Sequence, residues 1–257
     1  IWNYSSSPSI NNCTFTNNHS NTGGGGIYNE NSSSTLSNCT FTSNVATATG
    51  GGVFDFNSNS TLTNCTFMYN DSHNGGAINA NYGSAPVITY CTFVGNTSDY
   101  GGGMIIWDTD GVTMSDCVFE GNIANFEGGG VFAASNETIS ANLTLLSCSF
   151  TSNTASDVGG GISNMPEANT TIIDTLVCGN TPDQVYGEYI DGGENTITDE
   201  CPLGCPDING DEVVDVSDLL IVIAYWGSAD SPADLNFDGV VDVSDLLILI
   251  AAWGPCE

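Results

Sequence analysis

Asn38-Cys39-Thr40-Phe41-Thr42-Ser43-Asn44 is the stretch of sequence that recurs along most of the chain. Its cysteine has counterparts 26 residues apart, and a last one follows after 31 residues: Cys13, Cys39, Cys65, Cys91, Cys117 and Cys148. A phenylalanine stands two residues after each cysteine: Phe15, Phe41, Phe67, Phe93, Phe119 and Phe150. An asparagine stands three residues after each phenylalanine: Asn18, Asn44, Asn70, Asn96, Asn122 and Asn153. A fixed period of this length is typical of a solenoid, in which each repeat is one coil.

Each repeat contains short β-branched and aromatic runs that are separated by Asn, Ser and Gly turns. Such runs predict three short strands per coil. Equivalent residues of successive coils then lie one strand spacing apart, so that phenylalanines and cysteines fill the interior as ladders. We interpret the six ladder cysteines as small, buried, apolar side chains. We therefore expect an all-β solenoid, a right-handed parallel β-helix with about seven coils of about 26 residues, over residues 1–180.

Two short motifs of the repeat are also family features. The Phe-x-x-Asn word, as in Phe41–Asn44, and the Gly-Gly-apolar word, as in Gly51-Gly52-Val53, resemble the repeats of polymorphic outer-membrane proteins and related secreted bacterial β-helices. This resemblance implies a secreted β-helix. It implies nothing about catalysis.

A different motif follows Pro202. The stretches 207–218 and 234–245 are 12-residue loops that begin 27 residues apart. Their oxygen donors stand at positions 1, 3, 5, 7, 9 and 12, the spacing with which an EF-hand loop wraps a calcium ion. The first loop offers Asp207, Asn209, Asp211, the carbonyl of Val213, Asp215 and Asp218. The second offers Asp234, Asn236, Asp238, the carbonyl of Val240, Asp242 and Asp245. We expect two Ca²⁺ ions, one in each loop.

Each loop leads directly into an apolar helix, and position 12 is Asp where EF-hands have Glu. The duplicated loop and helix resemble type I dockerins, over residues 205–257. The resemblance implies docking onto a cohesin module through loop positions 10 and 11, which here are Val216 with Ser217 and Val243 with Ser244. Identical pairs in both copies imply two related docking orientations.

The two helical stretches of this module depart from the dockerin pattern. Residues 219–227 and 246–254 read LLIVIAYWG and LLILIAAWG, without the basic residues that dockerin helices carry. A helix that is apolar on all sides is normally buried on all sides. We therefore expect the module to pack against the end of the β-helix or against a neighbouring subunit.

Four cysteines lie outside the ladder. Cys178 is out of register with the seventh coil, whose ladder position is Thr175. Four cysteines allow three pairings. We expect Cys178–Cys201, which closes a capping or linker segment over residues 181–204, and Cys205–Cys256, which joins the two ends of the C-terminal module.

The charge of the chain restricts its partners. It contains no Lys or Arg and 30 Asp and Glu, a formal net charge of −30. Nucleic acids and anionic membranes repel such a surface. The longest apolar runs are too short to cross a bilayer, and ten cysteines favour an oxidising, extracellular compartment. The chain starts at Ile1 without an initiator Met or a signal peptide, which predicts a processed or partial product.

Catalysis is disfavoured by the residues that are missing. The lyases of this fold use Arg or Lys as base and charge clamp, and this chain has neither. The two histidines, His19 and His73, are far apart in sequence and are interpreted as isolated surface residues. A polysaccharide hydrolase that uses two carboxylates, for example Asp108 and Asp110, is the remaining catalytic alternative.

A structural function is the main expectation. Ile1 aligns with Ile27, so the first coil starts in mid-turn and leaves an open strand edge. We expect head-to-tail assembly through this edge into a calcium-stabilised extracellular fibre or surface layer, with a cohesin-like surface protein as the other possible partner. The alternative is a monomeric adhesin or carbohydrate-binding surface protein, whose contact surface is the insertion 134–142 together with Trp107.

Overall fold

The chain forms two compact units in the computed structural model, Ile1–Cys201 and Pro202–Glu257. The structure describes residues 1–135, 141–201, 205–229, 231–236 and 239–256. Residues 136–140 of the predicted contact loop, and Asp238 of the second calcium loop, lie outside this part. The finer division into 1–180, 181–204 and 205–257 stays a prediction.

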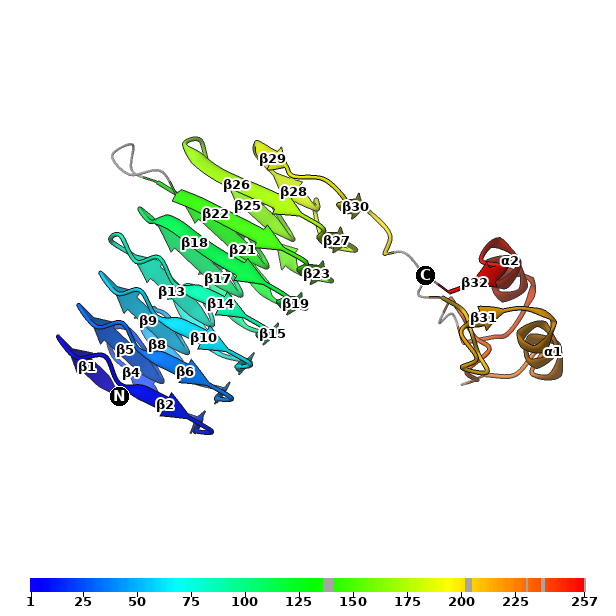
Figure 1. The fold of residues 1–257 in the computed structure, drawn as a ribbon, viewed down its shortest axis with the longest axis horizontal. Helices are drawn as coiled ribbons and strands as arrows, with labels where there is room; N and C mark the ends of the chain where they lie inside the picture. The colour runs from blue at the N-terminus through cyan, green and yellow to red at the C-terminus, as the bar shows by residue number, and fades with distance from the viewer. Residues whose placement is uncertain (136–140, 202–204, 230, 237–238, 257) are drawn as a thin grey trace. The chain divides into compact units, whose positions relative to one another are not determined.

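The first unit is a stack of coils in which each turn adds one strand to three parallel sheets and, on six turns, to a fourth (Figure 1). Sheet A contains β1 (Trp2–Tyr4), β5 (Ile27–Glu30), β9 (Val53–Phe56), β13 (Ile78–Asn81), β17 (Met104–Trp107), β21 (Val131–Ala134), β25 (Ile162–Asn164) and β28 (Val185–Tyr186). Sheet B contains β2 (Ser9–Asn11), β6 (Thr35–Ser37), β10 (Thr61–Thr63), β14 (Val87–Thr89), β18 (Asp110–Ser115), β22 (Ala141–Leu146), β26 (Ala168–Ile173) and β29 (Tyr189–Asp191).

The other two sheets close the coil. Sheet C contains β3 (Thr14–Thr16), β7 (Thr40–Thr42), β11 (Thr66–Met68), β15 (Thr92–Val94), β19 (Val118–Glu120), β23 (Ser149–Thr151), β27 (Leu176–Cys178) and β30 (Thr196–Thr198). Sheet D contains β4 (His19–Ser20), β8 (Val45–Thr49), β12 (Asp71–Asn74), β16 (Thr97–Tyr100), β20 (Ile123–Glu127) and β24 (Thr154–Ala155). A parallel solenoid of about seven turns is confirmed, but with four strands on most turns, not three.

The interior is filled by the ladders that the repeat predicts. Phe41, Phe67 and Phe93 are fully buried, and their ring centroids lie 4.7 and 5.1 Å apart in stacked pairs. The ladder asparagines bond along the axis as well: Asn70 Nδ2 donates to Asn96 Oδ1 at 2.9 Å and to the carbonyl oxygen of Phe41 at 3.0 Å. Each such amide therefore joins three coils, which satisfies turn groups that would otherwise be buried without partners.

The Gly-Gly words lie where coils approach each other most closely. A Cβ on Gly51 would stand 2.3 Å from the carbonyl oxygen of Gly76 on the next coil. A side chain at this position would therefore push the coils apart, which is why the word recurs with the repeat.

The segment after Asn180 adds a last, shorter coil. Its strands β28, β29 and β30 pair with β25, β26 and β27. Gln184 stands where the next ladder asparagine would be: its Oε1 accepts from the backbone N of Asn180 at 3.1 Å and from Asn180 Nδ2 at 2.8 Å. The glutamine amide thus ends the asparagine ladder.

The second unit is a small module of two helices. It contains β31 (Val213–Val214), α1 (Val216–Ala224), α2 (Val243–Ala251) and β32 (Gly254–Pro255), and β31 pairs with β32 in antiparallel fashion. Its core is formed by five fully buried residues: Val214, Val222, Ala233, Val241 and Leu249. Neither α1 nor α2 is long enough to span a bilayer, and the same holds for the rest of the described chain.

Candidate functional site

The two predicted calcium loops fold alike, each closed by the aspartate at position 12. In the first loop Asp218 is buried at the start of α1, and its Oδ1 accepts from the backbone N of Ile208 at 2.8 Å and of Asn209 at 3.1 Å. Its Oδ2 accepts from the backbone N of Asp215, the N-cap residue of α1, at 2.9 Å. This carboxylate therefore holds the beginning of the loop against the beginning of the helix.

The second loop repeats these contacts. Asp245 accepts from the backbone N of Leu235 at 2.6 Å, of Asn236 at 3.2 Å and of the N-cap Asp242 at 2.8 Å. Burial alone would raise the pKa of Asp218 and Asp245, but the backbone N–H groups that donate to each carboxylate outweigh it, so both pKa values are lowered. Both carboxylates are therefore held in their charged form.

The acids at the start of the first loop face its own backbone. Asp207 accepts from the backbone N of Gly210 at 2.7 Å and of Glu212 at 2.6 Å. Asn209 Nδ2 donates to Asp211 Oδ2 at 2.9 Å. The side chains at positions 1, 3 and 5 thus take part in hydrogen bonds within one tight loop, although Asn209 and Asp211 are exposed.

A left-handed residue makes the sharp turn at position 6 in both loops. It is Glu212 with φ +67° in the first loop and Gly239 with φ +89° in the second. EF-hand loops need this turn and use glycine for it. The backbone of both loops therefore has the EF-hand turn, although only the second has the usual residue.

Among the described residues, one buried oxygen of the second loop has no hydrogen-bond partner. Asp234, at position 1, is 8% exposed, and its Oδ2 accepts from the backbone N of Gly239 at 2.9 Å. Its Oδ1 is buried without a hydrogen-bond partner. A buried carboxylate oxygen is costly to leave unsatisfied, and a calcium ion is a partner that fits it.

Carboxylates, amides and carbonyls are the donors that a hard cation such as Ca²⁺ prefers. The donor set of both loops and the free oxygen of Asp234 fit calcium, and no Lys or Arg competes for these acids. The part of the chain that the structure describes, which omits Asp238, contains no ready-made cluster of three or more acidic, His or Cys side chains in metal-binding geometry. Val213 lies in β31, and Val240 is exposed beside Val241.

The predicted docking residues begin the two helices. Val216 and Val243 are each 55% exposed, and Leu220 and Leu247, one turn later, are 60% and 61% exposed. Ser217 is exposed and Ser244 is half-buried. Each helix buries only one side in the module, through Val222 or Leu249. The module itself therefore leaves the other side of each helix uncovered, and packing of that side on the end of the β-helix or on a neighbouring subunit stays a prediction.

The cysteines divide into two kinds. The structure joins Cys178 to Cys201 and Cys205 to Cys256. The six ladder cysteines are free, and all but Cys13 are buried. A hydrogen bond to Cys65 and burial raise the pKa of the Cys91 thiol, which therefore stays protonated inside the coil.

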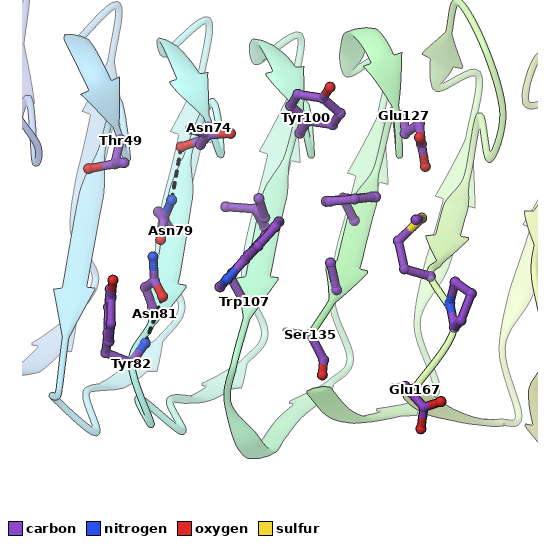
Figure 2. Close-up of a pocket in the computed structure, with 15 residues that line it drawn as sticks. Thr49, Asn74, Asn79, Asn81, Tyr82, Tyr100, Trp107, Glu127, Ser135 and Glu167 are labelled. Carbon is purple, nitrogen blue, oxygen red and sulfur yellow. Dashed lines mark hydrogen bonds between the residues drawn. The ribbon is translucent and has the colours of Figure 1, made fainter. Parts of the chain in front are cut away.

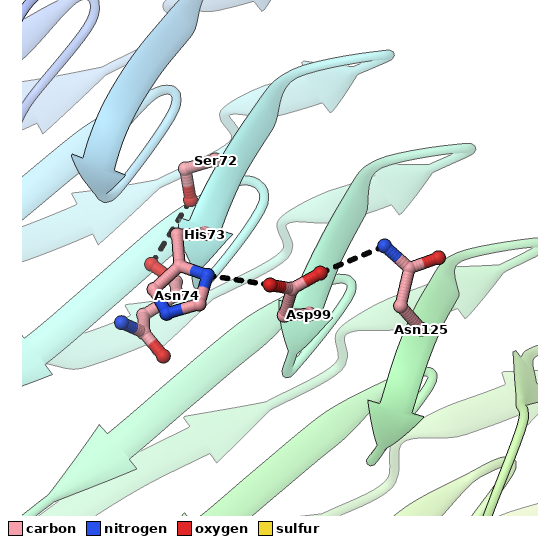
Figure 3. Close-up of polar contacts among 5 residues, drawn as sticks. All are labelled: Ser72, His73, Asn74, Asp99 and Asn125. Carbon is pink, nitrogen blue, oxygen red and sulfur yellow. Dashed lines mark hydrogen bonds and ion pairs between the residues drawn. The ribbon is translucent and has the colours of Figure 1, made fainter.

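His73 has a charged neighbour that sequence reading missed. Its Nδ1 lies 2.5 Å from Asp99 Oδ2 on the next strand of sheet D, and Asn125 Nδ2 on the following strand donates to Asp99 Oδ1 at 2.7 Å (Figure 3). Ser72 does not complete a catalytic triad, because its Oγ donates to the backbone oxygens of Asn74 and Gly75. The row of polar side chains is a surface feature of sheet D.

The candidate carboxylate pair is not arranged as two equivalent acids. Asp108 is buried, whereas Asp110 is exposed and accepts from Asn142 Nδ2 at 2.6 Å. The two side chains therefore lie in different environments. Trp107, next to them, lies on the outer face of sheet A and is 37% exposed.

Two family models match the chain. "Right handed beta helix region" matches residues 1–177, and "Dockerin type I domain" matches residues 206–253. No curated protein and no solved structure matches it. The predicted likeness to polymorphic outer-membrane proteins stays a prediction. Type I dockerins bind calcium and cohesin partners and are typical of extracellular or cell-surface proteins. The chain thus belongs to the right-handed β-helix family and carries a dockerin-like module in its C-terminal part.

Proposed function

We propose that the protein is a non-enzymatic extracellular component that docks through its C-terminal module onto a cohesin-like receptor, with two calcium ions in the loops. The observation that carries this proposal is the duplication of an exposed apolar face. The β-helix is then a rigid body that the module attaches to the receptor.

The two helices offer nearly the same surface. Val216, Leu220 and Ile223 lie at i, i+4 and i+7 on α1, and all three are at least 54% exposed. Their counterparts on α2 are exposed to a similar degree: Val243, Leu247 and Ile250. A soluble module rarely leaves such apolar stripes uncovered, so each stripe is a candidate contact. Two equivalent stripes support two alternative docking orientations.

Calcium binding in the two loops stabilises the helices that present these apolar stripes. We assign one ion to Asp207, Asn209, Asp211, Val213, Asp215 and Asp218, and the other to Asp234, Asn236, Asp238, Val240, Asp242 and Asp245. A bound ion neutralises the acids of its loop and holds the loop in shape. Since Asp215 and Asp242 cap α1 and α2, each ion also fixes the start of one docking helix.

The absence of Lys and Arg limits the kind of contact that the C-terminal module can make with its receptor. Without Lys or Arg, the module cannot form ion pairs with an acidic receptor surface. Recognition through Val216, Val243 and the neighbouring serines is apolar and hydroxyl-mediated, and we expect a receptor that is neutral or basic at its contact.

Calorimetric titration of the full chain with a panel of type I cohesin modules, in calcium and in excess EGTA, tests the proposal. The expected result is binding of at least one cohesin in calcium, lost in EGTA and regained when calcium is restored. Failure of all cohesins to bind a calcium-loaded chain would contradict docking.

The other functions expected from the sequence have less support. Head-to-tail assembly depended on the edge of β1 at Ile1, and a preceding segment of a longer chain would cover the same edge. The apolar stripes could instead bind a second copy of the chain. Light scattering in calcium separates the two cases, because a calcium-dependent dimer or polymer with no cohesin binding would replace the receptor by self-assembly.

A further inference from the structure

A groove of the first unit lies on the outer face of sheet A. It has a volume of about 700 Å³ and extends over strands β13, β17, β21 and the residues after β25. Three strand spacings correspond to a length of about 14 Å. This volume is typical of a small-molecule site. Because the groove is elongated, it fits an extended ligand.

Aromatic and amide side chains from successive coils line this groove. Figure 2 shows Asn79, Asn81 and Trp107 between two sides of the groove, with Tyr100 on the side where the strands begin and Tyr82 on the side where β13 ends. Phe132 continues the row that Asn79 begins, because the register pairs Asn79 with Ile105 and Ile105 with Phe132. Tyr100 packs against the Phe132 ring at 5.4 Å between centroids, which fixes one wall.

The groove also contains an unsatisfied polar atom. Asn79 is 1% exposed, and its Nδ2 donates to the backbone oxygen of Asn74 at 3.3 Å, but its Oδ1 has no hydrogen-bond partner among the residues that the structure describes. A buried acceptor without a partner costs about 1–3 kcal/mol. Because Asn79 lines the groove, a ligand hydroxyl that donates to Oδ1 would recover this loss, which favours a hydroxylated ligand.

Charge and topology narrow the class of ligand. The groove contains Glu127 and Glu167, and the whole chain has no Lys or Arg, so uronates, phosphates and other anions are repelled. A peptide that adds a strand needs a free sheet edge. The groove is a sheet face, whose strands β13, β17 and β21 are paired on both sides. A neutral molecule with flat apolar faces and many hydroxyls fits both constraints.

We propose that this groove binds a neutral oligosaccharide. Its sugar rings pack on the faces of Trp107 and Tyr82, and its hydroxyls bond to Asn79, Asn81 and Glu127. The site is separate from the docking helices, so the body of the protein holds a glycan while the C-terminal module holds a receptor.

Fluorescence and calorimetric titrations of the full chain test this site with neutral hexasaccharides of β-glucan, xylan and mannan, with an oligogalacturonate hexamer and with a basic octapeptide. We expect at least one neutral hexasaccharide to bind and the oligogalacturonate not to bind. Trp107→Ala should weaken binding at least about tenfold, the equivalent of about 1.4 kcal/mol. Trp2→Ala, on the same sheet but outside the groove and 67% exposed, should change it less than about twofold.

A second pair of variants, at Tyr82 and Tyr90, tests the side of the groove that Tyr82 forms. Tyr82 and Tyr90 have φ of 53° and 54° and are 60% and 62% exposed, but only Tyr82 lines the groove. Tyr82→Ala should weaken binding several-fold and Tyr90→Ala should not. No binding of any neutral hexasaccharide, equal effects within either pair, or binding of the basic peptide alone would each overturn the proposal.

Discussion

Asn29 Nδ2 donates to Asp55 Oδ1 at 2.8 Å across two coils, and both side chains are fully buried inside the solenoid. Ser60 Oγ donates to the same oxygen at 2.9 Å, whereas Asp55 Oδ2 has no hydrogen-bond partner in the described part of the chain. Burial raises the pKa of Asp55 to about 7, although the hydrogen bonds of Asn29 and Ser60 oppose the rise. The coil therefore contains an acid that prefers its protonated form.

This acid makes the stability of the solenoid depend on pH. Its folded pKa of about 7 lies above the ordinary value of 3.8, so the folded state binds more protons between these values. The stability from protonated Asp55 is fully present below about pH 4 and is lost as the pH rises to about 7, a change on the order of 4 kcal/mol. Urea unfolding at constant calcium should show this slope, and Asp55→Asn should flatten it. An unchanged slope in the variant would contradict the buried charge.

The asparagine ladder should be sensitive at its centre. Asn96 Nδ2 donates to Phe67 O and Asn122 Oδ1, and its Oδ1 accepts from the backbone N and Nδ2 of Asn70. Asn96→Ala leaves these buried groups without partners and should cost on the order of 3 kcal/mol in denaturant unfolding. Asn125→Ala, an exposed asparagine on β20, should cost less than about 0.5 kcal/mol. Equal costs would mean that the ladder contributes nothing specific.

Calcium stoichiometry tests the unsatisfied oxygen of Asp234. Asp234→Ala removes the position 1 donor of the second loop and should reduce the calorimetric stoichiometry from two ions to one. Asp157→Ala removes an exposed acid of the solenoid and should leave it at two. Two ions in both variants would show that Asp234 is no ligand.

The turn at position 6 offers a gain in stability. Glu212 has φ +67°, a conformation that costs a non-glycine residue about 1 kcal/mol or more. Glu212→Gly should raise the melting temperature of the C-terminal module, measured by differential scanning calorimetry. Glu212→Ala removes the same charge but keeps the Cβ, and it should give no comparable gain. If both variants gain equally, charge and not backbone strain is the cause.

Regular spacing made much of this molecule predictable. The 26-residue period places Phe41 on Phe67 and Asn70 on Asn96, because a parallel coil repeats its register at every turn. The 12-residue loops and the helices into which they lead were also predicted, from the spacing of the acids. The structure adds that the acids at positions 9 and 12 cap those helices.

Sheet D, the buried Asp55 and the groove were not predicted, because sequence alone does not show whether a polar side chain faces the interior or the solvent. Sheet D was missed because strands such as Asp71–Asn74 contain no alternating apolar residues. Asp55 was not predicted to be buried, because an acid is rarely found inside a fold without a charged partner, but it lies inside on the same face as buried Asn29. Alignment on the repeat does place Asp99 beside His73, and that signal was available. The groove needed the structure, since its aromatic residues occupy different positions of different repeats.

The docking claim is tested most directly by calorimetric titration of the full chain with a cohesin that binds it. The affinity is compared between the unaltered chain and variants in which the apolar face of α1, of α2 or of both helices is altered. Val216→Asp alone and Val243→Asp alone should each weaken binding only about twofold, because one equivalent orientation remains. The double variant should lose at least about 100-fold, while Val87→Asp, on exposed β14, should have no effect. Undiminished binding by a folded, calcium-loaded double variant would contradict docking through these two faces.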